Sequence, residues 1–226
     1  MASETSICVM ICLALVPLYV VVVRLVQILP TNKENSIDDS RLSSISDKRG
    51  SNIAILLGSG GHTGEMMRIL DNLDLSNMSR TWITSSGDTT SIYKAKDFED
   101  KLSSAYICNF VQLPRARKVG EGIILSIYNS IKSLVFTVPA LLKLPQLPAI
   151  LLVNGPGTSV PLAYILFMMK FFGICNTKII YIESLARVNK LSLSGKFILP
   201  IADRFIVQWE DLYHKYRRAE YYGILL

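Results

Sequence analysis

From residue 52 onward, short apolar runs alternate with segments in which apolar residues recur every three or four positions. Short apolar runs are typical of strands buried on both faces, and the three-to-four spacing is typical of amphipathic helices. Strands are predicted at residues 53–57, 81–84, 106–113, 149–153, 178–182 and 204–208. Helices are predicted between them, at 63–70, 89–102, 122–144, 160–172 and 195–201, and a last one begins near residue 209. This alternation predicts a Rossmann-like α/β domain in which helices cover a parallel sheet.

The first 30 residues have a different pattern. An apolar run spans residues 7–29 and is interrupted only by Pro17, Arg24 and Gln27. As a helix it would be about 34 Å long, which is enough to cross a bilayer. A cleaved signal peptide is the competing interpretation, but Glu4 and no basic residue precede the run. This favours an uncleaved transmembrane anchor.

Charge asymmetry predicts the orientation of this anchor. Basic residues lie on its C-terminal side, so that side and the domain after it should face the cytosol. Residues 31–51 are rich in Ser, Asn, Asp, Lys and Arg, which predicts a flexible tether. The chain is therefore expected to consist of an anchor at 1–30, a tether at 31–51 and a globular domain at 52–226.

Two of the predicted helices, at 122–144 and 160–172, are unusually apolar. Burial against the sheet is the first interpretation, because parallel sheets need apolar cover on both faces. A second transmembrane span is disfavoured by Lys132, Lys143 and Lys170, which interrupt the two runs. The remaining alternative is that one of these helices lies in the membrane interface, with its lysines at the lipid headgroups.

Composition and charge narrow the function classes. Of the 226 residues, 50% are hydrophobic and the mean hydropathy is +0.35, which supports a membrane segment. The net charge of +6 fits an anionic partner such as a lipid headgroup or a pyrophosphate. No basic helix or aromatic-interleaved basic stretch indicates nucleic acid. The four cysteines form no CxxC pair and there are two histidines, so neither a zinc site nor a disulfide framework is predicted.

The clearest candidate for chemistry follows the first predicted strand. Residues 58–65 are G-S-G-G-H-T-G-E, with four glycines in seven positions and a helix expected to open at Thr63 or Gly64. Glycines let the backbone approach a ligand, and the free N–H groups and dipole of a helix N-terminus attract a phosphate or diphosphate. The loop is no P-loop, since no lysine follows the glycines. It also departs from the dinucleotide fingerprint, because Thr63 replaces the third glycine.

Other polar residues should converge on this loop. If the strand order is 3-2-1-4-5-6, the loops after the first and fourth strands flank the crevice in which open parallel sheets bind ligands. The second loop is 154–159, where Asn154, Gly155 and Gly157 offer N–H groups to an anion or simply form a tight turn. Glu183 and Arg187 follow the fifth strand, next to it.

Two residues are candidates for a general base. His62 is the first, since the positive end of a helix favours the neutral imidazole that can take a proton; the alternative is a structural histidine that bonds its own loop. Glu183 is the second, either as a base or as a hydrogen-bond partner of a sugar hydroxyl. Alternatively, Glu183 pairs with Arg187 and braces the loop, while Arg187 is itself a candidate partner of a pyrophosphate.

Five motifs, in order, carry a resemblance to a known family. They are G-S-G-G-H-T-G-E-M at 58–66, N-G-P-G-T at 154–158, Y-I-E-S-x-x-R-V at 181–188, L-S-x-S-G-K at 191–196 and D-x-F-I-V-Q-W at 203–209. Together they resemble the membrane-anchor subunit of the eukaryotic dolichol-linked N-acetylglucosaminyltransferase, over about residues 52–226. The resemblance implies transfer of N-acetylglucosamine from UDP-N-acetylglucosamine to N-acetylglucosaminyl-diphosphodolichol, on the cytosolic face of the endoplasmic reticulum membrane.

In that family the enzyme is split between two chains. The resemblance implies that this chain supplies the anchor and the acceptor-side half of a GT-B glycosyltransferase and is inactive alone, while a small cytosolic partner binds the UDP-sugar donor. Transfer would be inverting and would need neither metal nor cofactor. The acceptor diphosphate and sugar would meet Gly58, Ser59, Gly60, Gly61, Thr63, Asn154, Gly155, Gly157, Thr158 and Arg187. The apolar tail would dock on the partner, or pack on its own sheet: Tyr222, Gly223, Ile224, Leu225 and Leu226.

Two other function classes stay open at this point. A membrane-bound dinucleotide-binding oxidoreductase would use the same glycine-rich loop, although Thr63 in place of the third glycine counts against it. A membrane scaffold would use the fold without any chemistry at His62 or Glu183.

Overall fold

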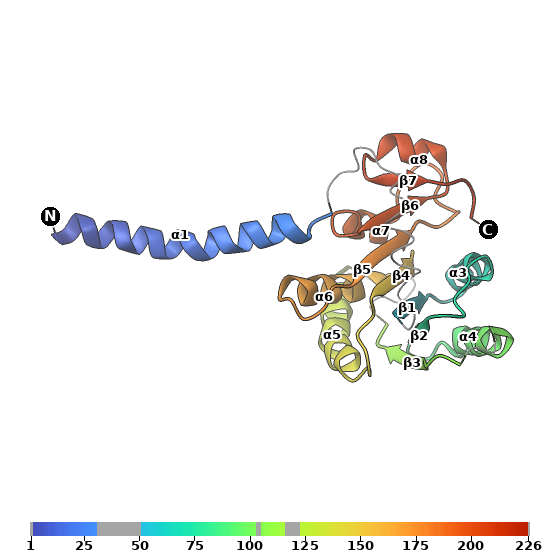
Figure 1. Cartoon of the computed structure of the whole chain (residues 1–226). Helices are drawn as coiled ribbons and strands as arrows, with labels where there is room; N and C mark the ends of the chain where they lie inside the picture. Colours follow the sequence, from blue (N-terminus) through green and yellow to red (C-terminus); the bar gives the residue numbers. More distant parts are fainter. Residues whose placement is uncertain (1, 31–50, 103–104, 116–122, 226) are drawn as a thin grey trace.

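The computed structural model describes residues 2–30, 51–102, 105–115 and 123–225, without the side chains of 2–14, 123–127 and 130. Seven strands alternate with helices from Asn52 onward (Figure 1). The strands are β1 (Asn52–Leu57), β2 (Ser79–Ser85), β3 (Cys108–Leu113), β4 (Ile150–Asn154), β5 (Lys178–Ile182), β6 (Arg204–Val207) and β7 (Ala219–Tyr221). The helices are α1 (Ala2–Ile28), α3 (Gly61–Asp71), α4 (Thr89–Leu102), α5 (Ile123–Leu142), α6 (Ser159–Phe171), α7 (Leu193–Ile198) and α8 (Glu210–Lys215).

The strands form one sheet in the order β3-β2-β1-β4-β5-β6-β7, and every neighbouring pair is parallel. The order assumed for the first six strands is therefore confirmed. The chain reverses its direction of travel across the sheet between β1 and β4, which pair directly, so the loops after these two strands flank the crevice. The sequence does not predict β7, which pairs with β6 just before the segment interpreted as a tail.

Helices cover both faces of the sheet. In Figure 1, α3 and α4 lie on one face, and α5 and α6 lie on the other. Alternate side chains of β1 enter the two cores: Ala54 and Leu56 pack with the α5–α6 layer, and Ile55 and Leu57 pack with the α3–α4 layer. This two-sided burial is the reason why β1 has a continuous apolar sequence, and it confirms the Rossmann-like parallel fold.

The two apolar helices differ in burial. Most of α6 is buried, as predicted, and its Leu162 and Leu166 are fully enclosed. Helix α5 buries Ser133, Thr137 and Leu141, which are four residues apart on one side. Its other side exposes large apolar side chains by 39–65%, at alternating spacings of three and four: Tyr128, Ile131, Val135, Val138 and Leu142. These five residues, here the exposed α5 stripe, show that burial alone is the wrong interpretation for α5.

The C-terminal end of α1 is fixed to α6. The Arg24 guanidinium donates from Nε to the carbonyl of Phe171 at 2.9 Å and from Nη2 to the carbonyl of Lys170 at 2.8 Å. A cation is favourable there because the last carbonyls of a helix carry partial negative charge. Ile28 also enters the core beside α6. Helix α1 thus projects from the side of the domain that α5 and α6 form (Figure 1).

The apolar surface of α1 is exposed on several sides. Eight of its large apolar side chains are 42–70% exposed: Leu15, Val16, Leu18, Tyr19, Val20, Val21, Val22 and Val26. Within the part of the chain that the structure describes, no helix has both the length and the apolar character needed to cross a membrane. The predicted anchor at 7–29 overlaps residues 7–14, whose side chains lie outside the described part. The predicted tether lies outside it as well, apart from Ser51.

Candidate functional site

The turn after β1 leads directly into α3. Gly60 has a φ of 67°, in the left-handed region that favours glycine, and α3 begins at Gly61. The prediction that the helix opens at Thr63 or Gly64 is therefore wrong by two or three residues. The positive φ of Gly60 completes the loop after β1 at that residue, so α3 begins at Gly61 and His62 lies in its first helical turn. Because the first N–H groups of a helix lack helical acceptors, the exposed start of α3 is able to receive an anion.

The two glycine-rich turns are in contact, as predicted. A Cβ atom on Gly155 would lie 2.5 Å from Cε1 of His62, so the imidazole packs on the glycine backbone. A Cβ atom on Gly58 would lie 2.8 Å from the Pro156 ring and 2.9 Å from the Cβ of His62. Only glycine permits these approaches, which bring the two loops together at the carboxyl edge of the sheet.

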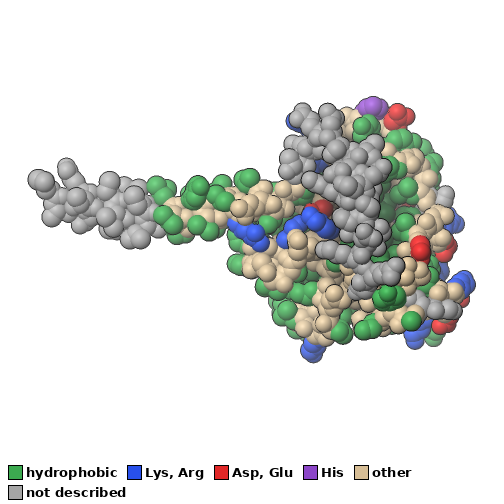
Figure 2. Space-filling model, in the orientation of Figure 1, with side chains coloured by type: hydrophobic (Ala, Val, Ile, Leu, Met, Phe, Trp, Pro, Cys, Tyr) green, Lys and Arg blue, Asp and Glu red, His purple; other side chains and the backbone are tan. Residues whose placement is uncertain are grey.

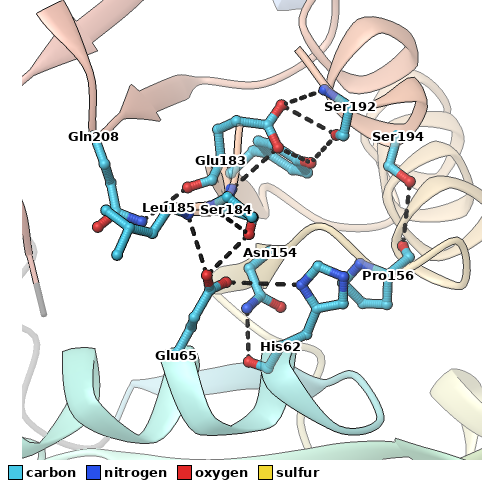
Figure 3. A network of polar contacts seen from close by, with 12 residues as sticks. His62, Glu65, Asn154, Pro156, Glu183, Ser184, Leu185, Ser192, Ser194 and Gln208 are labelled. Carbon is cyan, nitrogen blue, oxygen red and sulfur yellow. Dashed lines mark hydrogen bonds and ion pairs between the residues drawn. The ribbon is translucent and has the colours of Figure 1, made fainter. Parts of the chain in front are cut away.

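Asn154 joins the two turns. Its side chain is 1% exposed, and its Nδ2 donates to the carbonyl of His62 at 2.8 Å. This bond holds the first turn of α3 against the end of β4 (Figure 3). Asn154 thus supports the predicted site with its side chain, whereas the sequence suggested only its backbone N–H.

Glu65 lies one helical turn after His62 and faces the same crevice. Its Oε1 accepts from the Ser184 hydroxyl at 2.9 Å and from the backbone N–H of Leu185 at 3.1 Å. Its Oε2 lies 3.7 Å from Nδ1 of His62 (Figure 3). Glu65 therefore links α3 to the segment that follows β5.

Glu183 is fully buried, and its carboxylate is engaged by its own loop. Oε1 accepts from the N–H of Ser184 at 3.1 Å, and Oε2 accepts from the N–H and the hydroxyl of Ser192 at 2.9 and 3.0 Å. A Cβ atom on Gly195 would lie 2.3 Å from Oε2, so α7 closes over the carboxylate. Burial, and then the charge of Glu183, raise the pKa of the neighbouring Tyr181 hydroxyl well above its usual range.

Glu183 and Arg187 form no ion pair among the described residues, where Glu183 is enclosed and Arg187 is exposed. The alternative that these two side chains brace the loop together is therefore wrong. The bracing comes from Ser192, which also caps α7 by accepting from the N–H of Gly195 at 2.9 Å.

Two predicted binding residues turn their side chains into the fold. The Thr63 hydroxyl is buried and lies 2.7 Å from the hydroxyl of Ser91 on α4. The Thr158 hydroxyl lies 3.3 Å from that of Ser85 at the end of β2. Of these two residues only the backbone is left for a ligand. Ser59, Gly60, Gly61 and Gly157, in contrast, are exposed.

For the C-terminal tail, residues 222–226, the sequence offered two roles: packing on its own sheet and docking on a partner. The described residues differ in this respect. Leu225 packs on the α3–α4 core, and its N–H donates to Oε1 of Gln208 at 3.3 Å. Tyr222 and Ile224 are 52% and 55% exposed, and Gly223 turns the chain between them with a φ of 85°. Leu226 lies outside the described residues. Docking on a partner stays a prediction.

A family model described as "Oligosaccharide biosynthesis protein Alg14 like" matches residues 53–225. The chain belongs to the Alg14 family. The resemblance drawn from the five motifs is thereby confirmed, and family membership speaks against the oxidoreductase alternative.

Relatives of the Alg14 family match along the whole chain. A protein of Debaryomyces hansenii named "UDP-N-acetylglucosamine transferase subunit ALG14" is 56% identical over 232 residues, covering 100% of both chains. A Candida albicans protein of the same name is 53% identical over 226 residues, again covering 100% of both. The solved structure of Arabidopsis thaliana UGT89C1 complexed with quercetin matches 78% of this chain with a TM-score of 0.51 and 13% identity. This likeness shows the fold alone, and the chain spans about half (51%) of that protein.

Glu65 is the site residue that the sequence interpretation of this Alg14 family member omitted. The sequence does indicate Glu65, because it lies within the 58–66 motif and three positions after His62, and residues at this spacing share one side of a helix. Within the described chain, no group of three or more His, Cys, Asp or Glu side chains has a metal-binding arrangement.

Proposed function

We propose that this chain is the acceptor-side subunit of a UDP-N-acetylglucosamine transferase that acts in N-glycan precursor assembly. The names of its full-length relatives support the reaction class. The observation that carries the acceptor role is the contact of His62 with Gly155, because it joins two anion-binding turns and a proton acceptor at one edge of the sheet.

The start of α3 supplies the anion site of this proposal. The N–H groups of Gly61 and His62 and the positive end of the helix dipole would receive the acceptor diphosphate. The imidazole of His62, which is 35% exposed, would take the proton of the acceptor hydroxyl during attack on the donor sugar. Glu183, in contrast, is proposed to support the site from within the fold, since its carboxylate has no open side toward a substrate.

The donor half is proposed to come from a second chain. A catalyst of the GT-B type closes two Rossmann-like domains around its substrates, and the described chain forms one such sheet. A small cytosolic subunit would hold UDP-N-acetylglucosamine and would dock on the exposed Tyr222 and Ile224 of the tail.

The test is co-expression of the full chain with candidate donor-binding subunits, followed by transfer assays with UDP-N-acetylglucosamine and N-acetylglucosaminyl-diphosphodolichol. We expect transfer from the complex and none from either chain alone. An Ile224→Asp variant should co-purify less partner, because it places a charge on an exposed apolar contact. A control at another exposed apolar residue, Tyr93→Asp on α4, should co-purify as much partner as the unaltered chain. Full activity of the chain alone would contradict the proposal.

Attachment to the cytosolic face of the endoplasmic reticulum membrane is proposed to involve both α1 and α5. Large apolar side chains are exposed on several sides of α1, where Figure 2 shows hydrophobic surface, and they need an apolar solvent. Helix α5, which carries the exposed α5 stripe, lies on the side of the domain from which α1 projects (Figure 1). Lys132 and Lys143 are both exposed beside the stripe, where they would meet anionic headgroups.

Lipids that carry a photoactivatable acyl chain should label α5 of the full chain in membranes. Helix α4 is the internal control, because Tyr93 is 71% exposed there but lies on the opposite face of the sheet. We expect labelled peptides from residues 123–142 and none from 89–102, as measured by mass spectrometry. An Ile131→Glu, Val135→Glu double variant should remove the α5 label. Equal labelling of both helices, or none of α5, would contradict the contact.

A further inference from the structure

Three buried polar atoms at the site lack a hydrogen-bond partner among the described residues: Nδ1 of His62, Oε2 of Glu65 and Oδ1 of Asn154. Buried polar atoms are nearly always paired, so three such atoms in one cluster require an explanation. Two of them are complementary, since an imidazole Nδ1–H donates and a carboxylate oxygen accepts. These two atoms lie 3.7 Å apart, slightly beyond hydrogen-bond distance.

The carboxylate of Glu65 is held from its other side. Its Oε1 accepts two hydrogen bonds from Ser184 and Leu185, and these fix the rotation of the carboxylate plane. Rotation away from His62 would break both bonds. Oε2 is thereby directed at the ring from one turn along the same helix (Figure 3).

The ring of His62 is held as well. Its backbone carbonyl accepts from Asn154, and Gly155 lies against Cε1. A ring supported in this way keeps Nδ1 toward Glu65 and leaves Nε2 as the nitrogen that a substrate can reach. A closure of less than 1 Å would bring Nδ1 and Oε2 to a charge-assisted hydrogen bond of about 2.8 Å.

We propose that Glu65 is a positioning residue that fixes the tautomer and orientation of His62. The inference rests on the proposed function. With the proton on Nδ1, Nε2 accepts the proton of the attacking acceptor hydroxyl. The oxygen then bonds to the anomeric carbon of the donor sugar, and the bond from that carbon to the nucleoside diphosphate breaks, with the electron pair leaving on the diphosphate. The carboxylate of Glu65 stabilises the imidazolium so formed.

The loop after β5 has a part in this arrangement. It supplies both donors to Glu65, and it is itself fixed by Glu183 and by Trp209, whose Nε1 donates to the carbonyl of Leu185 at 2.7 Å. Glu183 therefore acts on His62 through Glu65. Of the two residues that the sequence offers as general bases, His62 meets the substrate and Glu183 supports it from within the fold.

The decisive variant is Glu65→Gln in the full complex with the donor-binding subunit. Its Oε1 retains an acceptor for Ser184 and Leu185, but its amide presents N–H groups to Nδ1 and so favours the Nε2–H tautomer, which cannot take the hydroxyl proton. We expect kcat to fall about 100-fold or more, with little change in the KM for the acceptor. Glu65→Asp, which keeps the charge, should recover part of kcat.

Glu210→Gln is the matched control. Glu210 lies 3.6 Å from Nε2 of His214 on α8, and both side chains are nearly 70% exposed, so the pair is screened by water and contacts neither His62 nor Glu65. This variant should leave kcat, KM and the His62 tautomer unchanged, because an exposed pair of this kind contributes little.

A spectroscopic readout separates this inference from the proposed function. The chain has two histidines, so ¹⁵N-labelled histidine gives two ring patterns, and His214→Gln assigns them. The expected pattern for His62 is Nδ1–H in the unaltered chain and Nε2–H in Glu65→Gln. An unchanged tautomer and kcat in Glu65→Gln, with transfer lost in His62→Ala, would overturn the inference and leave the proposed function intact. Unchanged transfer in His62→Ala would contradict the proposal that His62 is the general base.

Discussion

Replacing Gly155 by alanine is expected to lower transfer by the assembled enzyme about 100-fold, the effect of displacing a reacting group by about 1 Å. The added Cβ atom would lie 2.5 Å from Cε1 of His62, which is shorter than the distance at which two carbon atoms can pack without a clash. The ring, which is partly exposed, would rotate outward and lose its alignment with Glu65. The fold should survive, since the clash is with a side chain and not with the backbone. Initial-rate assays together with thermal unfolding measure both effects.

Gly64→Ala is the control for that experiment. Gly64 also lies in the first motif, but a Cβ atom there has no neighbour within 4 Å. Because alanine is favoured over glycine within a helix, this variant should keep full activity and gain about 0.5–1 kcal/mol of unfolding free energy. If both variants lost the same amount of transfer activity, the glycines would matter for backbone flexibility and not for the packing of the His62 imidazole.

Replacing Glu183 by alanine is expected to lower the unfolding free energy by about 2–4 kcal/mol. The change leaves the N–H groups of Ser184 and Ser192 buried without their acceptor and opens a cavity under α7. For a domain of this size, the melting temperature should fall by roughly 10 °C. Thermal unfolding of the solubilised full chain measures the shift.

The same variant distinguishes the two roles considered for Glu183. If it braces the loop, activity and stability fall together, and low temperature restores much of the activity. An unchanged melting temperature with lost transfer would instead identify a catalytic carboxylate. Asp97→Ala is the control, because its ion pair with Lys101 is 67–74% exposed and contributes little.

The sheet could be predicted from the sequence because its central strands β2, β1 and β4 are buried on both faces. Apolar runs such as 53–57 and 178–182 are too short to be typical helices, and the glycine-rich turns mark the ends of β1 and β4. The order of strands was an assumption of the sequence analysis, and the structure has that order for the first six strands. The proximity of the two glycine-rich turns followed from that order, because β1 and β4 are neighbours in the sheet.

The details of the site were less accessible, because they depend on side-chain direction. Nothing in the local sequence shows that Thr63 points to Ser91, or that Glu183 is enclosed by Ser192 and Gly195. Both facts depend on how a following helix packs, α4 for Thr63 and α7 for Glu183. β7 was missed for a related reason: its three residues have no pattern of their own and are specified by the edge of β6.

Helix α6 carries a different structural element at each of its ends. The Asn154–Thr158 turn, on which the imidazole rests, leads into its first residue, and Arg24 of α1 is bonded to the carbonyls of its last turn. Its 13 residues make a rod of about 20 Å. If α1 enters the membrane as proposed, the helix that carries the seat of His62 at one end is held at its other end by the membrane anchor.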